Sequence, residues 1–171
     1  DNPLLGLSSR GLARLAGEIY AANGITAYLV DPDDPAATLT TPELSYAIRR
    51  LGAAGGVNLS ASHNPPDDNG IKVYDARGGQ FAAPEDDAFA ARVAAAVPRP
   101  PSEFARARAA GLIRALPDEV TAGYREVYRV QYARRRGAVP RVPGRIVFTP
   151  LNGCGERTVA TVLRDLGFDV V

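Results

Sequence analysis

The sequence predicts an α/β fold, because segments with the spacing of amphipathic helices alternate with short apolar segments typical of buried strands. Residues 9–22 have helical spacing, and the apolar run "ITAYLV" at residues 25–30 follows them as a strand. The order strand, glycine loop, helix, strand appears at residues 145–171. The chain has 171 residues, 46% hydrophobic and 23% charged, which suits one large domain or one and a half ordinary ones.

The first half of the chain contains two predicted helices and three predicted strands. Asn23-Gly24 ends the first helix, and the polar run "DPDDPAATL" forms a loop after the first strand. Thr41 as the N-cap and Pro42 at the first helical position predict a second helix that includes "ELSYAIRRLG". Two short strands, "VNL" and "IKVY", are expected on either side of a polar segment.

The second half of the chain begins with helices and then alternates again. The expected elements are helices at 86–97 and 118–135, a weaker helical stretch up to Arg114, a strand at "RIVFTP", a helix at 157–166 and a strand at "GFDVV". We therefore expect a first domain at residues 1–116 and the beginning of a second at residues 117–171, with the boundary near Pro117. Because the chain has no methionine, begins Asp1-Asn2-Pro3 and ends on an apolar run, we expect it to be part of a longer protein.

The composition narrows the class of protein. A net charge of +1 gives no reason to expect a nucleic acid or an anionic membrane as partner. Cys154 is the only cysteine, so it cannot form an internal disulfide, which fits a cytoplasmic location. No uninterrupted apolar run approaches the roughly 20 residues needed to span a bilayer.

The segment "SASHNPPDDNGIKVY" at residues 60–74 carries the side chains most suited to chemistry. It contains the only histidine, His63, and the only lysine, Lys72, in a chain that otherwise uses arginine as its basic residue. Its Asn, Pro, Asp and Gly residues favour turns, and Pro65-Pro66 restricts the backbone. Rigid loops at strand ends are where α/β proteins place their sites. We therefore expect a functional loop between the "VNL" and "IKVY" strands.

Lysine differs from arginine in that it releases its proton readily. A lone lysine in an arginine-rich chain therefore suggests proton transfer or amine chemistry at Lys72. A serine beside His63 and Lys72 suits a nucleophile for acyl or phosphoryl transfer, and Ser62 is the candidate. The residues alone leave the plainer alternatives open: a hydrogen-bonded Ser-His turn, and a solvated surface lysine.

The same segment closely resembles the T-A-S-H-N-P-P-x-x-N-G-x-K-x-Y signature of the α-D-phosphohexomutases, which include phosphoglucomutases and phosphomannomutases. "TPELSYAIRRLGAAGGV" resembles the family segment before the active-site loop, and "GGQ" follows the motif at the usual place. "IVFTPLNGCGERTVATVLRDLGFDVV" resembles the strand and helix that open the family's second domain. The resemblance covers nearly the whole chain.

The resemblance implies an architecture of four domains around a central cleft. This chain is then domain 1, a mixed sheet sandwiched between helices with its N-terminal strand missing, and the start of a similar α/β domain 2. The family's metal loop, sugar-specificity loop and phosphate-binding loop are absent. We therefore expect the chain alone to be inactive, with the missing C-terminal domains needed to complete the active site.

The resemblance also assigns roles to individual residues. Ser62 matches the serine that carries a phosphoryl group and donates it to a hexose phosphate, through a bisphosphorylated hexose that also acts as activator. Mg²⁺ is expected on a phosphate oxygen of Ser62 and on aspartates of the absent metal loop. Lys72 matches a candidate general acid/base, and His63 and Asn64 match residues that position substrate and phosphoserine. Arg10 aligns with an arginine near the phosphoserine.

Two positions depart from the family pattern. Ser8 stands where the family usually has Asp, close to Arg10, and Asn152 stands where many members have His. Ser60 occupies the Thr position of the motif and is not the nucleophile, and Asp67-Asp68 are interpreted as solvated loop residues.

The expected activity is interconversion of hexose 1-phosphate and hexose 6-phosphate, with glucose phosphate as the main substrate. Phosphomannomutase, phosphoglucosamine mutase and a non-catalytic sugar-phosphate-binding paralogue are alternatives. A serine hydrolase using Ser62 and Lys72 is a further one, although the chain has no G-x-S-x-G elbow.

Overall fold

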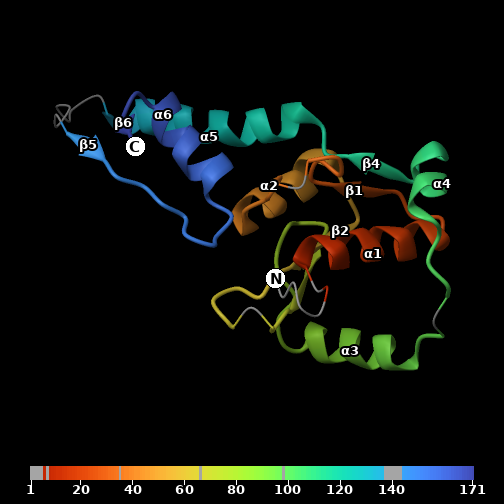
Figure 1. The fold of residues 1–171 in the computed structure, drawn as a ribbon. Coiled ribbons are helices and arrows are strands. Elements are labelled where there is room, and N and C mark those ends of the chain that lie inside the picture. The colour runs from red at the N-terminus through yellow and green to blue at the C-terminus, as the bar shows by residue number, and fades with distance from the viewer. Residues whose placement is uncertain (1–5, 7, 35, 66, 98, 137–143) are drawn as a thin grey trace.

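The structure is a computed structural model that describes residues 6, 8–34, 36–65, 67–97, 99–136 and 144–171. Helices and strands alternate along this part of the chain, which confirms the predicted α/β class (Figure 1). The helices are α1 (Ser9–Ala22), α2 (Thr41–Leu51), α3 (Glu85–Ala95), α4 (Phe104–Ala109), α5 (Asp118–Arg136) and α6 (Thr161–Asp165), with a π-helical segment η1 (Glu156–Ala160) leading into α6. The strands are β1 (Ala27–Leu29), β2 (Gly55–Leu59), β3 (Ile71–Asp75), β4 (Ile113–Ala115), β5 (Arg145–Ile146) and β6 (Asp169–Val170).

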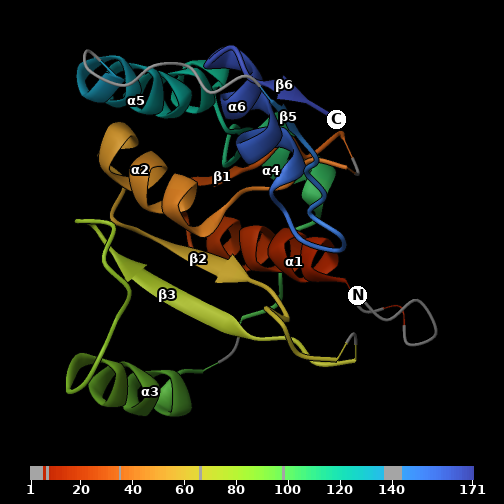
Figure 2. The ribbon, with the colours of Figure 1, turned by 90° about the vertical axis from the view of Figure 1, so that its left-hand side faces the viewer.

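The described strands are hydrogen-bonded as three two-stranded sheets, which include parallel and antiparallel pairs. β1 and β4 are parallel, with Ala27 opposite Ile113, and β5 and β6 are parallel, with Arg145 opposite Asp169. β2 and β3 form an antiparallel hairpin that lies beside α1 and α2 (Figure 2). This hairpin carries the loop singled out in the sequence.

Three predictions about individual elements were wrong. The weak helical stretch does not run to Arg114: α4 stops before Gly111, which has a φ of +72°, and β4 then pairs with β1. Thr41 is the first helical residue of α2 and not its cap, because Thr40 has the extended cap conformation. The strand expected over "RIVFTP" is limited to β5.

The buried core around α1 joins elements distant in sequence. Ala21, Ala107 and Ile113 are buried together, with partly buried apolar residues packed around them. α1 packs against this core through Gly17, where an added Cβ would lie 3.5 Å from the Leu29 side chain. This packing fixes α1 against the β1–β4 pair, so its first turn has a defined position relative to the sheet layer.

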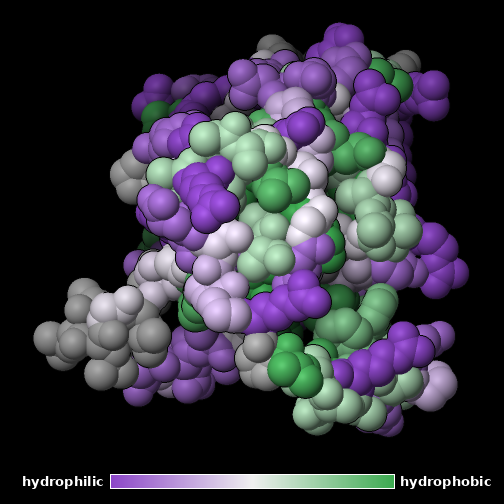
Figure 3. All heavy atoms as spheres, turned by 90° about the vertical axis from the view of Figure 1, so that its right-hand side faces the viewer, coloured by the Kyte–Doolittle hydropathy of each residue, from purple (hydrophilic) through white to green (hydrophobic). Residues whose placement is uncertain are grey.

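α3 is the least buried helix of those described. None of its residues is buried, and its aromatic contact is between Phe81 and Phe89, whose ring centroids are 5.4 Å apart. Val93 is 57% exposed. The face of the molecule in Figure 3 shows hydrophobic residues interspersed with hydrophilic ones. Among the described residues, no helix is both long and apolar enough to cross a membrane.

α5 follows the predicted domain boundary directly. It begins at Asp118, directly after Pro117, and packs against both α2 and α6. Tyr124 contributes a ring contact to Tyr46 with centroids 5.6 Å apart, and its hydroxyl lies 2.8 Å from that of Tyr128. Burial and the hydrogen bond with Tyr128 raise the pKa of Tyr124. The boundary itself stays a prediction.

The segment before α6 is attached to the region around the start of α2. The buried Glu43 carboxylate accepts a hydrogen bond from Thr158 Oγ1 at 2.9 Å. Arg157 forms an ion pair with Asp34, and Thr38 Oγ1 donates to the Cys154 carbonyl at 3.2 Å. These contacts hold the 150–160 region against the first part of the chain.

Candidate active site

The loop at residues 61–69 is closed at its base by the β2–β3 hairpin. Beyond the last strand pair, Ser60 N–H donates to the Gly70 carbonyl at 3.0 Å, and Gly70 N–H donates to the Ser60 carbonyl at 3.1 Å. The hairpin therefore continues for one pair past β2 and β3. Both ends of the loop are fixed by the sheet, as the sequence predicted for a loop between two short strands.

Ser62 has a left-handed backbone conformation, with a φ of +56°. Only glycine adopts this region without penalty, and other residues are strained there by about 1–2 kcal/mol. A local turn maintains the conformation: Ser62 N–H donates to Ser60 Oγ at 3.0 Å, and Asn64 N–H donates to the Ala61 carbonyl at 3.0 Å. A strained, exposed serine in a sheet-anchored loop is typical of a functional position.

His63 lies beside the Ser62 hydroxyl. Its Nδ1 atom is 3.3 Å from Ser62 Oγ, and which atom donates depends on the histidine tautomer. Both side chains are exposed. The structure therefore brings two of the predicted site residues together, in a contact that orients the serine hydroxyl. Asn64, the next residue, shares the same exposed turn through its backbone N–H.

Lys72 lies on β3, and the strand register determines which side of the hairpin it faces. It is directly opposite Asn58 on β2, and such cross-strand partners point to the same side of a sheet. Asn58 Nδ2 donates to Thr41 Oγ1 at 3.0 Å, at the start of α2. Tyr74, two residues after Lys72, is buried on the same face. Lys72 therefore lies on the α2 side of the hairpin, near the end that carries the serine loop.

Two asparagines that the sequence analysis did not assign take part in the scaffold of this site. Asn58 connects the face that bears Lys72 to α2 through its hydrogen bond to Thr41. Asn69 Nδ2 donates to Ser9 Oγ at 3.0 Å, which attaches the loop to the first turn of α1. The signal for Asn58 was a polar residue inside an apolar strand, and the signal for Asn69 was its place before Gly70.

Arg10 is directed toward a different loop. Its Nη2 donates to the Asp31 carbonyl at 2.7 Å and its Nη1 to the Ala37 carbonyl at 3.3 Å. The described contacts of its guanidinium thus stabilise the loop between β1 and α2. Ser8, the neighbouring departure from the family pattern, is the N-cap of α1 and accepts from Gly11 N–H at 2.8 Å. Serine is a favoured N-cap residue, so the helix start keeps its cap.

The remaining residues of the loop are exposed where they are described. Asp67 and Asp68 are both exposed, whereas Pro66 lies outside the described residues, so the predicted rigidity of Pro65-Pro66 stays a prediction. Within the part of the chain that the structure describes, no group of three His, Cys, Asp or Glu side chains is placed to hold a metal ion. The described side chains alone therefore do not provide a complete metal site.

The strain at Ser62 gives a test of the loop conformation. We expect Ser62→Gly to be more stable than Ser62→Ala by about 1 kcal/mol, because glycine adopts positive φ without the Cβ penalty while both variants lack the hydroxyl. Urea unfolding of the two variants measures the difference. Equal stabilities, or a more stable alanine variant, would contradict the left-handed conformation.

Comparison with known proteins gives a consistent result. Residues 7–99 match the family model described as phosphoglucomutase/phosphomannomutase, alpha/beta/alpha domain I. The chain is 32% identical over 163 residues to a phosphoglucomutase of Staphylococcus aureus, and 35% identical over 162 residues to a phosphoglucomutase of Staphylococcus epidermidis. These alignments cover 94% and 92% of this chain, but the chain spans only 28% of the length of each relative.

Proposed function

Because this chain belongs to the phosphoglucomutase/phosphomannomutase family, we propose that it carries the phosphoserine part of a phosphohexomutase active site. The observation that carries the proposal is Ser62 itself: an exposed serine with a φ of +56°, contacted by His63 and held by a loop closed on both sides by the hairpin. The loop belongs to the region that matches the family model. Ser62 is the nucleophile in this account.

The proposed reaction interconverts hexose 1-phosphate and hexose 6-phosphate. Glucose phosphate is the proposed substrate, supported by relatives that carry the name phosphoglucomutase. Mannose phosphate and glucosamine phosphate remain alternatives within the family. The chain spans only 28% of those relatives, so the activity is proposed for a full-length protein that contains this chain.

The chemistry proceeds in two balanced transfers. In the first, a sugar hydroxyl oxygen forms a bond to phosphorus while the bond from phosphorus to Ser62 Oγ breaks; the hydroxyl loses its proton and Ser62 Oγ gains one. The product is a bisphosphorylated hexose, which reorients within the active site so that its other phosphoryl group faces Ser62. In the second, Ser62 Oγ forms a bond to the phosphorus at the other position while the bond from that phosphorus to the sugar oxygen breaks. Ser62 Oγ loses its proton and the sugar oxygen gains one, which releases the product sugar monophosphate.

Lys72 is the proposed proton carrier for the serine. As an ammonium it donates a proton to the departing Ser62 oxygen, and as an amine it accepts one when the serine attacks. An arginine in its place stays protonated under all physiological conditions. The use of lysine at this one position, in a chain with arginine elsewhere, supports the role.

Mg²⁺ is proposed to neutralise charge on the transferred phosphoryl group when it is bound. A phosphate oxygen on Ser62 is the ligand that this chain offers. The described side chains do not supply the others, so no step of the mechanism is assigned to the metal. We propose that the remaining ligands and the sugar-binding groups come from further domains, and that the isolated chain is inactive.

A serine hydrolase is the second candidate function, because Ser62 Oγ lies 3.3 Å from His63 Nδ1. Adjacent residues in one turn approach each other without forming a triad, and an acyl-transfer site also needs oxyanion donors. Covalent labelling of Ser62 by a fluorophosphonate would favour the hydrolase over the mutase.

The proposed function is tested by locating the phosphoryl group. Intact-mass measurement and peptide mapping of the full-length protein should find one phosphoryl group on Ser62. Incubation with glucose 6-phosphate should remove it from the peptide that contains residues 60–74. A phosphoryl group on Ser60 instead would contradict the assignment.

A further inference from the structure

The proposed role of Lys72 depends on the register of β3, because successive side chains of a strand point to opposite faces. A slip of one residue moves every side chain of the strand to the other side of the sheet. Val73, next along the strand, would then take the place of Lys72 opposite Asn58. What holds the register of β3 therefore determines whether Lys72 faces the α2 side.

β3 ends in a tight turn that its own last residue stabilises. The Asp75 carboxylate accepts hydrogen bonds from the backbone N–H groups of Arg77 and Gly79, each at 2.9 Å, and from Arg77 Nε at 2.7 Å. The backbone closes the same turn, because Asp75 N–H donates to the Gly79 carbonyl at 2.8 Å. The hydrogen bonds from Arg77 and Gly79 lower the pKa of the Asp75 carboxyl, so it stays an acceptor.

The chain after this turn returns along the other edge of β3. Gln80 forms a bridge with Tyr74, and Phe81 N–H donates to the Val73 carbonyl at 2.9 Å. β3 is therefore paired on one edge with β2 and on the other with residues 80–81. A slip of β3 would have to break both pairings and move the 75–79 turn.

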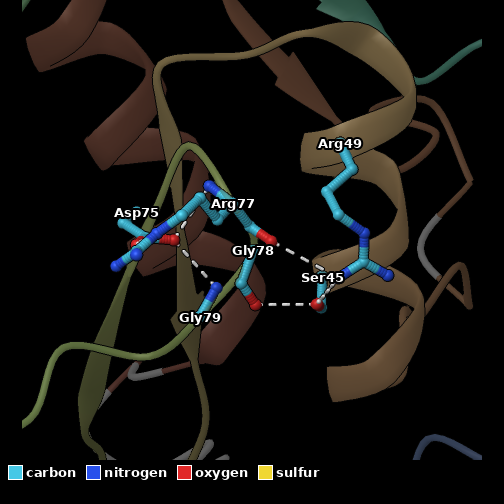
Figure 4. Close-up of polar contacts among 6 residues, drawn as sticks. All are labelled: Ser45, Arg49, Asp75, Arg77, Gly78 and Gly79. Carbon is cyan, nitrogen blue, oxygen red and sulfur yellow. Dashed lines mark hydrogen bonds and ion pairs between the residues drawn. The ribbon is translucent and has the colours of Figure 1, made fainter.

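This turn is attached to α2 by one hydroxyl (Figure 4). Ser45 Oγ donates to the Gly78 carbonyl at 2.7 Å and accepts from Arg49 Nη1 at 3.0 Å. Arg49 Nη1 also donates to the Arg77 carbonyl at 3.4 Å. A cationic donor behind the hydroxyl strengthens the hydrogen bond that the hydroxyl makes.

The close approach of the turn to α2 requires glycine at position 78. Gly78 is buried with a φ of +77°, and an added Cβ would lie 2.5 Å from the Ser45 carbonyl oxygen. At the opposite end of the hairpin, the Asn58 side chain donates a hydrogen bond to the Thr41 hydroxyl. Helix α2 thus holds the hairpin at two points, one at each end of the face that carries Lys72.

We propose that Ser45 is a positioning residue for Lys72: its hydroxyl holds the 75–79 turn on α2 and by this fixes the register of β3. The proposal rests on the proposed function for the importance of Lys72, but the geometry it predicts is independent of catalysis. Nothing in it requires Ser45 to contact substrate. Its effect on the reaction is exerted through the strand.

The position of Lys72 can be followed by NMR without overlap from other lysines, because it is the only lysine of the chain. The 171-residue chain labelled with ¹³C,¹⁵N-lysine therefore shows one lysine backbone amide and one set of side-chain signals. In Ser45→Ala we expect the Lys72 amide signal to move or to split in two, and hydrogen exchange at the Phe81 amide to become about tenfold faster. Ser45→Thr, which keeps a hydroxyl, should restore the original signals.

Two further variants keep the test decisive. Ser102→Ala removes a serine hydroxyl far along the chain and should leave the Lys72 signals unchanged. Arg49→Gln weakens the same attachment and should shift them in the same direction, even if Ser45→Ala folds poorly. Lys72 signals at their wild-type positions in Ser45→Ala, or in Arg49→Gln when Ser45→Ala does not fold, would overturn the proposal.

The catalytic consequence is measured separately in the full-length protein. We expect Ser45→Ala to lower kcat about tenfold with little change in KM, because the role proposed for Lys72 is proton transfer to and from Ser62 and not sugar binding. If Ser62 proves not to be phosphorylated, the proposed function fails while the Lys72 signals still report on the register. If the signals do not respond, the positioning role fails while the phosphoserine stands.

Discussion

Replacement of Ser62 by alanine is expected to lower mutase activity of the full-length protein by at least about a thousandfold, because the variant has no oxygen to carry the phosphoryl group. Both transfers pass through Ser62, so no other group of the loop replaces it. The measurement is the steady-state rate of glucose 1-phosphate conversion, supplied with the bisphosphorylated sugar so that activator is not limiting.

Ser60→Ala is the matched control for this experiment. It removes a hydroxyl two residues away, whose described bond is the one it accepts from Ser62 N–H at 3.0 Å. We expect a loss of about tenfold or less, since one turn hydrogen bond contributes about 1 kcal/mol. A loss of activity below tenfold in Ser62→Ala would contradict the assignment of the nucleophile. A loss of activity in Ser60→Ala that is larger than the loss in Ser62→Ala would contradict it as well.

Replacement of Lys72 by arginine is the second large effect expected. The positive charge is kept but the releasable proton is lost, so kcat should fall by at least about a hundredfold, the lower end of what general acid/base catalysis contributes. If Lys72 acts only through its charge, Lys72→Arg would keep most of the activity and Lys72→Met would lose it.

Arg50→Lys provides the control for exchanging these two residues. Arg50 is exposed near the end of α2, and its replacement should leave kcat and KM unchanged. Nearly full activity in Lys72→Arg would contradict the proton-transfer role and leave an electrostatic one.

The fold could be predicted from the sequence where local signals were strong. The first helix was predicted at residues 9–22 and is found there, because its apolar spacing and the following Asn23-Gly24 agree. β4 was missed because its three residues have no strand pattern of their own and become a strand only through pairing with β1. The N-cap of α2 was misplaced by one residue because Thr40 and Thr41 are equally good candidates, and Thr41 is bound to Asn58 instead.

The candidate site could also be predicted from the sequence only in part. The motif located the loop, and the adjacency of Ser62 and His63 in the sequence made their contact unsurprising. The face of Lys72 could not be predicted, because it depends on a strand register set by pairing with β2 and by the attachment of the 75–79 turn to α2. The partners of Arg10 were equally inaccessible, since they are carbonyls of a loop more than twenty residues away.

The most direct measurement of the central claim is a single-turnover chase of the phosphorylated protein. Phosphorylated full-length enzyme is mixed with excess glucose 6-phosphate, quenched at successive times, and digested to recover the peptide with residues 60–74. The account predicts that phosphate leaves Ser62 and appears in a bisphosphorylated hexose with equal amplitude, and that Ser62→Ala takes part in neither event. Sugar phosphate turnover while the phosphoryl group remains on Ser62, or turnover by a protein never phosphorylated there, would contradict it.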